Sequence, residues 1–376
     1  MDFGKITSDM ILLAAAMFFL LIQIFYFIFL FFRVAFHHAD TIRKNDLPPL
    51  SVVIAARSEA HNLVEFLPYI FEQNYPQFEV VVVNDRSWDD TKDILKAFMQ
   101  KYPNLHVVNI EEGNHKSPGK KMAITLGIKG AKYDHIVVTD ADCKPLSKEW
   151  LAEIASGFSG QAIDLVVGYS PFRKAKGFLN KLIRFDGMWV ALQYLSFAKA
   201  GIPYMGVGRN MAYKKDAFFK VGGFRKHYHI LSGDDDLFVN EIARKNNTSA
   251  VFTPNSQVET LPKDTISAWF VQKRRHYSTS PMYRVKHKFL LSFWAFSLIS
   301  FYGLSFVLLV LNKYLLITLG LLLFRTLLLM LTFIRAGKWL GNKDLLWGVV
   351  FYEMIFLFLY PILFFGRKKN KKPEWS

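Results

Sequence analysis

Two aspartates separated by one residue are the first candidates for chemistry in this chain. They follow the apolar residues 137–139 in the run Asp140-Ala141-Asp142-Cys143. A buried strand that ends in two carboxylates can hold a divalent cation, and such a cation serves mainly to bind phosphates. Asp-x-Asp also occurs by chance in loops and helix caps, so the motif needs support from the rest of the chain.

Two further stretches carry groups suited to a nucleotide. Asp85 follows the apolar residues 80–83, where a carboxylate can accept hydrogen bonds from a nucleobase or ribose; a turn-forming cap is the alternative. Residues 117–121, Ser-Pro-Gly-Lys-Lys, open an expected helix. The N–H groups of that helix and its two lysines would form an anion site, unless the lysines are simply solvated.

Asp234, Asp235 and Asp236 are three successive carboxylates at the start of a helix expected over 237–245. One of them suffices to cap the helix. Because neighbouring negative charges raise one another's pKa, another carboxylate at the edge of a cleft can serve as a general base.

Residues 269–277 mix aromatic side chains with cations just before a long apolar run. This pattern is typical of a helix at the membrane interface, and it would also suit a clamp on a diphosphate leaving group. Both functions are compatible, since they would use different faces of the helix.

An alternating order of strands and helices is expected to position these groups. Short apolar runs predict strands over 51–56, 80–83, 106–110, 136–139 and 165–168, and amphipathic stretches predict helices over 59–73, 90–100, 120–129 and 147–156. This order indicates a mostly parallel sheet covered on both faces, with ligands at the carboxyl ends of its strands.

Membrane segments flank this region. Hydrophobic residues make up 52% of the chain and aromatic residues 16%, more than a purely soluble protein carries. Residues 10–32 predict a membrane helix, since their apolar run is longer than that of a cleaved signal peptide and no small-x-small cleavage site follows. Residues 289–311, 314–334 and 345–365 predict three more spans.

Charges beside the spans predict the orientation. Arg33, Arg43 and Lys44 follow the first span and only Lys5 precedes it, which places the middle of the chain in the cytoplasm. Four spans would then put the basic residues 367–372 outside, against the charge rule. Either one late segment is re-entrant or the tail is an exception.

Two charges lie within the expected spans. Arg325 and Glu353 would be costly in lipid unless they pair with each other or contact a lipid headgroup, as a structural ion pair or part of an acceptor site. The net charge of +16 fits anionic lipids better than nucleic acid, because the cations lie beside the spans. Cys143 is the one cysteine, which excludes an intramolecular disulfide.

Four motifs in order, Asn84-Asp85, Asp140-Ala141-Asp142, residues 233–237 (Gly-Asp-Asp-Asp-Leu) and residues 272–275 (Gln-Lys-Arg-Arg), resemble the family 2 glycosyltransferases. The similarity covers about residues 50–277 and is greatest to the membrane-integral branch with the cellulose, chitin and hyaluronan synthases and the ceramide glucosyltransferases. It implies an α/β GT-A fold, a nucleotide-sugar donor with UDP-sugars favoured, a divalent cation (Mg²⁺ or Mn²⁺) and inversion at the anomeric carbon.

The resemblance also implies roles for individual residues. Asp234 would be the base, with Asp235 as the second choice, and Asp140 and Asp142 would hold the metal. The donor-binding residues would be Ala55, Ala56, Arg57, Glu59, Asp85, Lys120, Asp140, Gln272, Arg274 and Arg275. The acceptor-binding residues would be Gly206, Gly208, Asn210 and His276.

Two residues depart from the family pattern, and the first of them lies on the acceptor side. His276 stands where the family has tryptophan, which puts processive polymer synthesis in doubt, and Gly233 replaces a glutamate. A helix over 177–199 would lie along the membrane and shape an acceptor entrance, or be buried in the domain core.

The expected organisation is an anchor over 1–36, a cytoplasmic GT-A domain over 37–288, membrane helices over 289–366 and a basic tail over 367–376. The expected function is an inverting glycosyltransferase of the inner membrane that acts on a lipid or membrane-proximal saccharide. A processive polysaccharide synthase is the first alternative, and a non-catalytic transporter or channel with a nucleotide-binding domain is the second.

Overall fold

A mixed seven-stranded sheet forms the centre of the part of the chain that the structure describes. This computed structural model describes residues 7–38, 47–111, 119–160, 162–230 and 232–366. The strands follow the order β3-β2-β1-β4-β7-β6-β8, and β5 pairs with β9 in a separate ribbon. The strands are β1 Leu50–Ala56, β2 Phe78–Asp85, β3 Leu105–Ile110, β4 His135–Asp140, β5 Cys143–Pro145, β6 Leu165–Gly168, β7 Met211–Lys214, β8 Thr248–Val251 and β9 Val258–Thr260.

The five strands predicted from apolar runs are confirmed. β1 to β4 are mutually parallel where they pair, and β1 is buried at all seven positions, as expected for a β-branched strand with both faces covered. Strands β5, β7, β8 and β9 were missed, because they are only three or four residues long and lack the consecutive Leu and Val residues that marked β6. β7 runs antiparallel to both β4 and β6, which makes the sheet mixed.

Helices cover both faces of the sheet, as predicted. The α/β domain, taken here as the elements from β1 to α10, contains α3 Ala60–Phe71, α4 Thr91–Lys101, α5 Lys120–Gly130, α6 Trp150–Ser156, α7 Phe178–Lys199, α8 Lys215–Lys220, α9 Asp236–Ile242 and α10 Ile266–Tyr277. Helices α3, α4 and α6 share one apolar core with the sheet, and α5, α7 and α9 share the other. This second core continues into the membrane helices.

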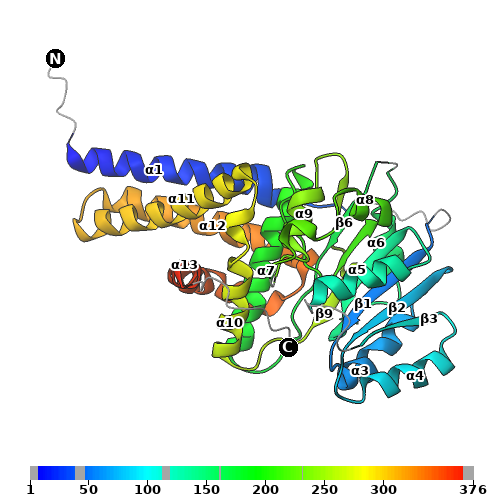
Figure 1. Ribbon diagram of the computed structural model, residues 1–376. Helices are drawn as coiled ribbons and strands as arrows, with labels where there is room; N and C mark the ends of the chain where they lie inside the picture. The colour runs from blue at the N-terminus through cyan, green and yellow to red at the C-terminus, as the bar shows by residue number, and fades with distance from the viewer. Residues whose placement is uncertain (1–6, 39–46, 112–118, 161, 231, 367–376) are drawn as a thin grey trace.

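Within the described ranges, four helical segments are long and apolar enough to cross a membrane: Ser8–Ala35, Val285–Val310, Leu315–Leu340 and Lys343–Phe365. The first combines α1 (Ser8–Tyr26), a π-helical turn and α2 (Phe32–Ala35). The others are α11 (Val285–Val310), α12 (Leu315–Leu340), and a 3₁₀ turn (Lys343–Gly348) followed by α13 (Val349–Phe365). Figure 1 shows α1 and α11 extending together away from the α/β domain.

The predicted pairing of Arg325 with Glu353 is confirmed. The two side chains form a bidentate ion pair, and Tyr302 on α11 donates a hydrogen bond to Glu353 at 2.8 Å. The Arg325 Nε donates to Gln23 Oε1 on α1 at 3.0 Å. The polar groups that would be costly in lipid are therefore satisfied by one another, and they join four helices.

Helix α7 lies between the sheet and the membrane helices, and most of it is buried. Phe185 stacks on Phe333 of α12, and Trp189 contacts Phe31 and Trp294 of the first and second membrane segments. Of the face predicted to lie along the membrane, only Phe178 is largely exposed, at 52%. Burial in the core is therefore the correct alternative for this helix.

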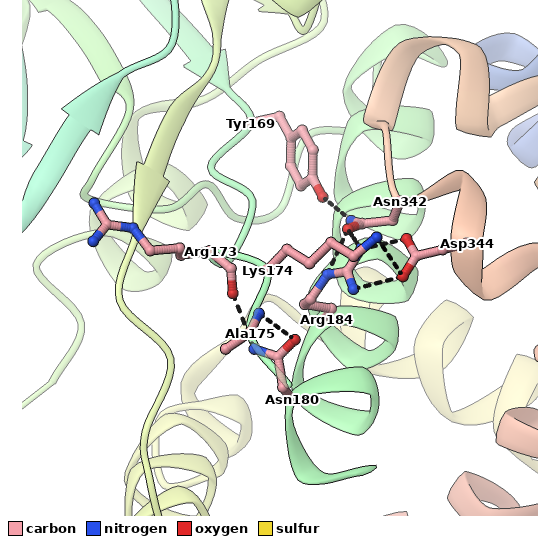
Figure 2. Close-up of polar contacts among 8 residues, drawn as sticks. All are labelled: Tyr169, Arg173, Lys174, Ala175, Asn180, Arg184, Asn342 and Asp344. Carbon is pink, nitrogen blue, oxygen red and sulfur yellow. Dashed lines mark hydrogen bonds and ion pairs between the residues drawn. The ribbon is translucent and has the colours of Figure 1, made fainter. Parts of the chain in front are cut away.

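A polar clamp fixes the connection between α12 and α13 to the α/β domain (Figure 2). Arg184 of α7 donates two hydrogen bonds to Asp344, at 2.6 and 2.9 Å, and two to Asn342 Oδ1. Lys174 pairs with the same aspartate at 3.4 Å, and Asn342 contacts the Tyr169 hydroxyl. The connection between these two membrane helices thus lies against the α/β domain.

Three predictions fall on residues outside the described ranges. These are the first part of the anion-site loop (117–118), two of the cations that follow the first span (Arg43 and Lys44), and the basic tail (367–376).

Candidate active site

The carboxyl ends of β1, β2 and β4 meet at one edge of the sheet. In the register of the strands, Ala55 lies beside Asp140, and Ala56 lies beside Asn84. Because the three strands are parallel neighbours, the loops that follow them project on the same side. The predicted donor-binding residues of β1 and β2 are thereby brought next to the Asp-x-Asp motif.

Asp140 and Asp142 form a compact pair of carboxylates beyond β4. Their oxygens and the Cys143 sulfur all lie within 4.8 Å of one another. Burial raises the pKa of the Cys143 thiol well above its usual value, and hard divalent cations prefer oxygen ligands to sulfur. Two carboxylates that repel each other suit a hard divalent cation such as Mg²⁺ or Mn²⁺.

The pKa shifts of the neighbouring carboxyl groups agree with a cation site at Asp140 and Asp142. Burial raises the pKa of Asp142, and the adjacent Asp140 charge raises it further. Burial also raises the pKa of Glu59, against a hydrogen bond from Asn62, with Asp142 and Asp140 acting in the same direction as burial. A bound cation would relieve this accumulation of negative charge.

Asp85 ends β2 with a buried carboxylate. Its Oδ1 accepts a hydrogen bond from Arg86 Nε at 2.7 Å, whereas its Oδ2 has no hydrogen-bond partner among the described residues. An unsatisfied buried oxygen is costly, and a ribose hydroxyl or base N–H would satisfy it. Arg57 lies over the exposed ring of Trp88, with its Cζ 5.4 Å from the ring centroid, at the rim of the same edge.

Lys120, the first residue of α5, links the two halves of the site. Its Nζ lies 2.6 Å from Asp140 Oδ1 and 3.2 Å from Asp234 Oδ2. Burial by itself lowers the pKa of this lysine, but Asp140 and Asp234 raise it above its ordinary value, so the ammonium stays charged. The Lys120 ammonium thus holds Asp140, of the predicted metal pair, close to Asp234, the predicted base.

The three successive aspartates have three different environments. Burial works to raise the pKa of Asp234, but the Lys120 charge prevails and lowers it. Asp235 caps α9 through the N–H of Asp236, and its Oδ2 accepts from the Gly208 N–H at 3.2 Å. Asp236 is buried and accepts hydrogen bonds from Thr279 and Tyr283. Asp234, the predicted base, thus has a lowered pKa, against the expectation that neighbouring charges would raise it, whereas the pKa values of Asp235 and Asp236 are raised.

The glycine-containing loop over 206–210 lies directly against this triplet. A Cβ on Gly208 would lie 3.5 Å from Asp234 Oδ2, so the loop backbone borders the base. Asn210, a predicted acceptor-binding residue, has a side chain that is 0% exposed. It accepts from Trp150 Nε1 and donates to two backbone carbonyls, so it braces the loop and has no free group for an acceptor.

Helix α10 carries the remaining predicted residues. Gln272 is half-buried, and Arg275 and His276 are exposed. Arg274 lies 6.0 Å from the Phe270 ring and beside Gly366 at the end of α13, and no described contact joins it to the carboxylate cluster. The role of Arg274 in binding the diphosphate therefore stays a prediction. The segment after His276 returns to the site through the bond from Thr279 to Asp236.

Two residues acquire roles that sequence reasoning missed. Lys121 was grouped with Lys120 as an anion ligand, but it is buried and donates to the carbonyl oxygens of His227, Ile230 and Ser232 at 2.6 to 2.9 Å. It therefore fixes the loop that leads to the aspartate triplet. Arg209 donates to Ser170 at 3.2 Å, and its charge acts on Asp142. Arg209 lies between Gly208 and Asn210, two predicted acceptor-binding residues, and this position could have indicated a role in the site.

Comparison with known proteins identifies the family. The model described as glycosyl transferase family 21 matches residues 14–368 of the chain. The chain belongs to this family. The predicted resemblance to family 2 is thus confirmed as membership of a GT-A family of that type.

The curated relatives match only part of this family 21 chain. Glycosyltransferase AglE of Haloferax volcanii is 31% identical over 197 residues, which is 50% of this chain and 59% of that protein. A probable glycosyltransferase of Bacillus subtilis, YdaM, is 28% identical over 54% of this chain and 51% of its own length. The chain therefore spans between half and three fifths of the length of these relatives.

A solved structure confirms the fold. The mannosyltransferase PcManGT from Pyrobaculum calidifontis, in complex with GDP-Man and Mn²⁺, superposes with a TM-score of 0.58 at 20% identity. The match covers 89% of this chain and 98% of that one. The expected GT-A class with flanking apolar helices is therefore correct.

Proposed function

We propose that this chain is a membrane-integral inverting glycosyltransferase with its α/β domain in the cytoplasm. It would move a sugar from a nucleotide-sugar donor to a lipid or to a membrane-proximal saccharide. The observation that carries the proposal is the position of Lys120, whose ammonium lies between Asp140 and Asp234. Inversion needs a carboxylate on the acceptor face of the anomeric carbon and positive charge on the diphosphate face, and this lysine brings the two sides together.

The donor would lie along the carboxyl edge of β1, β2 and β4. Asp85 supplies a free carboxylate oxygen to the nucleoside, and Glu59 and Arg57 lie at the same edge. Asp140 and Asp142 would hold a divalent cation, which when bound neutralises charge on the diphosphate. The related structure with Mn²⁺ agrees with a divalent cation in general, and the identity of the metal stays open.

Asp234 would accept the proton of the attacking hydroxyl. Its low pKa keeps it ionised at neutral pH, as a base must be before the transfer. The backbone at Gly208 leaves room beside it, since a side chain there would lie 3.5 Å from Asp234 Oδ2. His276, exposed at the end of α10, would face the acceptor from the membrane side.

The test is release of nucleotide by the purified protein against UDP-, GDP- and dTDP-sugars, with membrane lipid extract as acceptor and mass spectrometry of the product. A single added sugar mass on a lipid supports the proposal. A ladder of masses would favour a processive synthase instead, and no release with any donor would contradict transfer altogether. UDP-sugars are the favoured donors by resemblance, whereas the mannosyltransferase neighbour is bound to GDP-Man.

The variant Asp234→Asn tests the role of the base. The amide cannot take a proton, so turnover should fall by about 10²- to 10⁴-fold while donor affinity is retained. Asp235→Asn is the variant for comparison. It tests the second choice for the base, whose carboxylate already caps α9 and contacts Gly208. Turnover like that of the wild type in Asp234→Asn would contradict the assignment of Asp234 as the base.

A further inference from the structure

The last apolar helix, α13, has both of its ends against the α/β domain. At its start, the 3₁₀ turn carries Asp344, which the clamp holds through Arg184 and Lys174. At its end, Phe364 lies 6.3 Å from the ring of Tyr277 on α10, and a Cβ on Gly366 would lie 3.2 Å from Arg274 Nη2. Arg184, Lys174 and α10 all belong to the α/β domain.

The contacts continue along the whole of α13. Tyr352 and Phe356 pack against Phe185 of α7, and Tyr360 donates to Asp186 of the same helix at 3.0 Å. Its 17 residues extend roughly 26 Å at about 1.5 Å per residue. A helix of that length that crossed the bilayer would carry its last turns away from the domain instead of back to α10.

The two ends of helix α12, in contrast, lie at opposite ends of the bundle, as expected for a helix that crosses the membrane. The turn before it holds Lys313, which pairs with Asp9 at the start of α1, at the end of the bundle remote from the domain. Near its other end, the carbonyl of Trp339 accepts from Gln257 of the α/β domain at 2.6 Å. In Figure 1, α1 and α11 are seen from the side, whereas α13 is seen nearly end-on and thus runs across them.

The exposed face of α13 is apolar. Phe351, Phe358, Ile362 and Phe365 are 58%, 69%, 58% and 83% exposed, and they recur at helical spacing on the side opposite the contacts with α7. Trp347, in the turn before the helix, is 93% exposed. An apolar stripe with a tryptophan at its end fits the boundary between headgroups and acyl chains.

We propose that α13 does not cross the membrane but lies in its plane, with this stripe in the lipid on the side of the α/β domain. The chain then crosses three times, through the first segment, α11 and α12. The tail that follows Gly366 emerges on the side of the α/β domain, where its five cations in residues 367–372 can meet anionic headgroups. This removes the conflict between four crossings and the positive-inside rule.

The test is thiol labelling in sealed vesicles of both orientations with a membrane-impermeant maleimide. Three single variants are compared: Ser376→Cys in the tail, Lys101→Cys at the exposed end of α4, and Asn312→Cys in the exposed turn between α11 and α12. The unsubstituted chain is the blank, since Cys143 is buried at 1% exposure. Labelling after detergent treatment confirms that each introduced thiol reacts.

The proposal expects Ser376→Cys to be labelled in the same vesicles as Lys101→Cys, and in the opposite ones to Asn312→Cys. Labelling of the tail together with Asn312→Cys would mean that α13 crosses, and would overturn the proposal. Labelling from both sides, or only after detergent, would also overturn it. The readout requires no catalysis, so it is independent of the proposed transferase activity.

Discussion

The carboxylates at the sheet edge differ in what they are free to do. Asp140 and Asp142 lie close together beside the Cys143 thiol, and their carboxylates are the groups that suit a hard cation. Asp234 is held by Lys120, and Asp236 is enclosed by Thr279 and Tyr283. Neighbouring residues of one type thus have different partners, which fit the proposed metal and base roles and a structural role for Asp236.

Removal of a metal ligand should damage donor binding as well as turnover. We expect Asp142→Ala to weaken the affinity for a nucleotide sugar in the presence of Mn²⁺ by at least about tenfold. Isothermal titration with and without the metal measures this. Asp93→Ala removes an exposed carboxylate on α4 and should change nothing. Unchanged donor affinity in Asp142→Ala would exclude the pair as the metal site.

Asp236 makes stability depend on pH. Burial, and then the charge of Asp235, raise the pKa of Asp236 from 3.8 to about 7. The folded state therefore binds a proton that the unfolded state releases above about pH 4, so this contribution is complete at low pH and is lost as pH rises through about 7. Asp236→Asn keeps the neutral form at every pH.

The melting temperature of Asp236→Asn relative to the wild type should accordingly rise between pH 5 and pH 8. Thermal unfolding of the detergent-solubilised proteins at a series of pH values measures the difference. A difference that is constant over this range would show that Asp236 is ionised in the folded protein throughout.

At the scale of elements, two buried cations hold segments that are distant in sequence. Lys121 of α5 binds three carbonyls of the loop before α9 and so fixes the approach to Asp234. Arg184 of α7 holds the connection between α12 and α13 (Figure 2). Both side chains donate hydrogen bonds to backbone or side-chain oxygens that are no longer hydrated by solvent.

The clamp permits a matched pair of variants, because two cations contact the same Asp344. Arg184 is 3% exposed and bidentate, whereas the Lys174 side chain is 68% exposed. Arg184→Met should cost about 1.5 to 3 kcal/mol of stability, and Lys174→Met about 0 to 1 kcal/mol. Chemical unfolding in detergent compares them, and equal effects would contradict a buried clamp.

At the scale of the whole molecule, the apolar helices and the α/β domain share one core. Phe185 and Trp189 of α7 contact aromatic residues of the membrane segments, so the domain is packed directly onto the bundle. Arg325 and Glu353 join α12 to α13 and, through Gln23 and Tyr302, reach α1 and α11. The membrane part is thereby locked by polar contacts as well as by packing.

Replacement of Arg325 or Glu353 alone should lower the free energy of unfolding more than replacement of both. Arg325→Leu or Glu353→Leu leaves one uncompensated buried charge and should cost about 3 to 5 kcal/mol, while the double variant should recover most of that loss. Thermal unfolding of the four proteins forms the cycle. Lys313→Leu, which removes the more exposed pair with Asp9, should cost at most about 1 kcal/mol. Additive losses in the double variant would show that the pair is not coupled.

The sequence by itself determined the features that local pattern encodes. Uninterrupted Val-rich runs specify buried parallel strands, long uncharged runs specify membrane segments, and carboxylates at strand ends mark the ligand edge of a mixed sheet. Arg325 and Glu353 were recognised as partners for the same reason, since a charge in lipid needs an opposite charge nearby.

Only the tertiary structure decided which polar groups are free and which are occupied. Asn210 is taken by Trp150 and two carbonyls, and Lys121 by three carbonyls, through contacts with residues far away in sequence. The direction of α13 was undecided for the same reason. Composition shows that this helix is apolar, but only its contacts with α7 and α10 show where its far end lies.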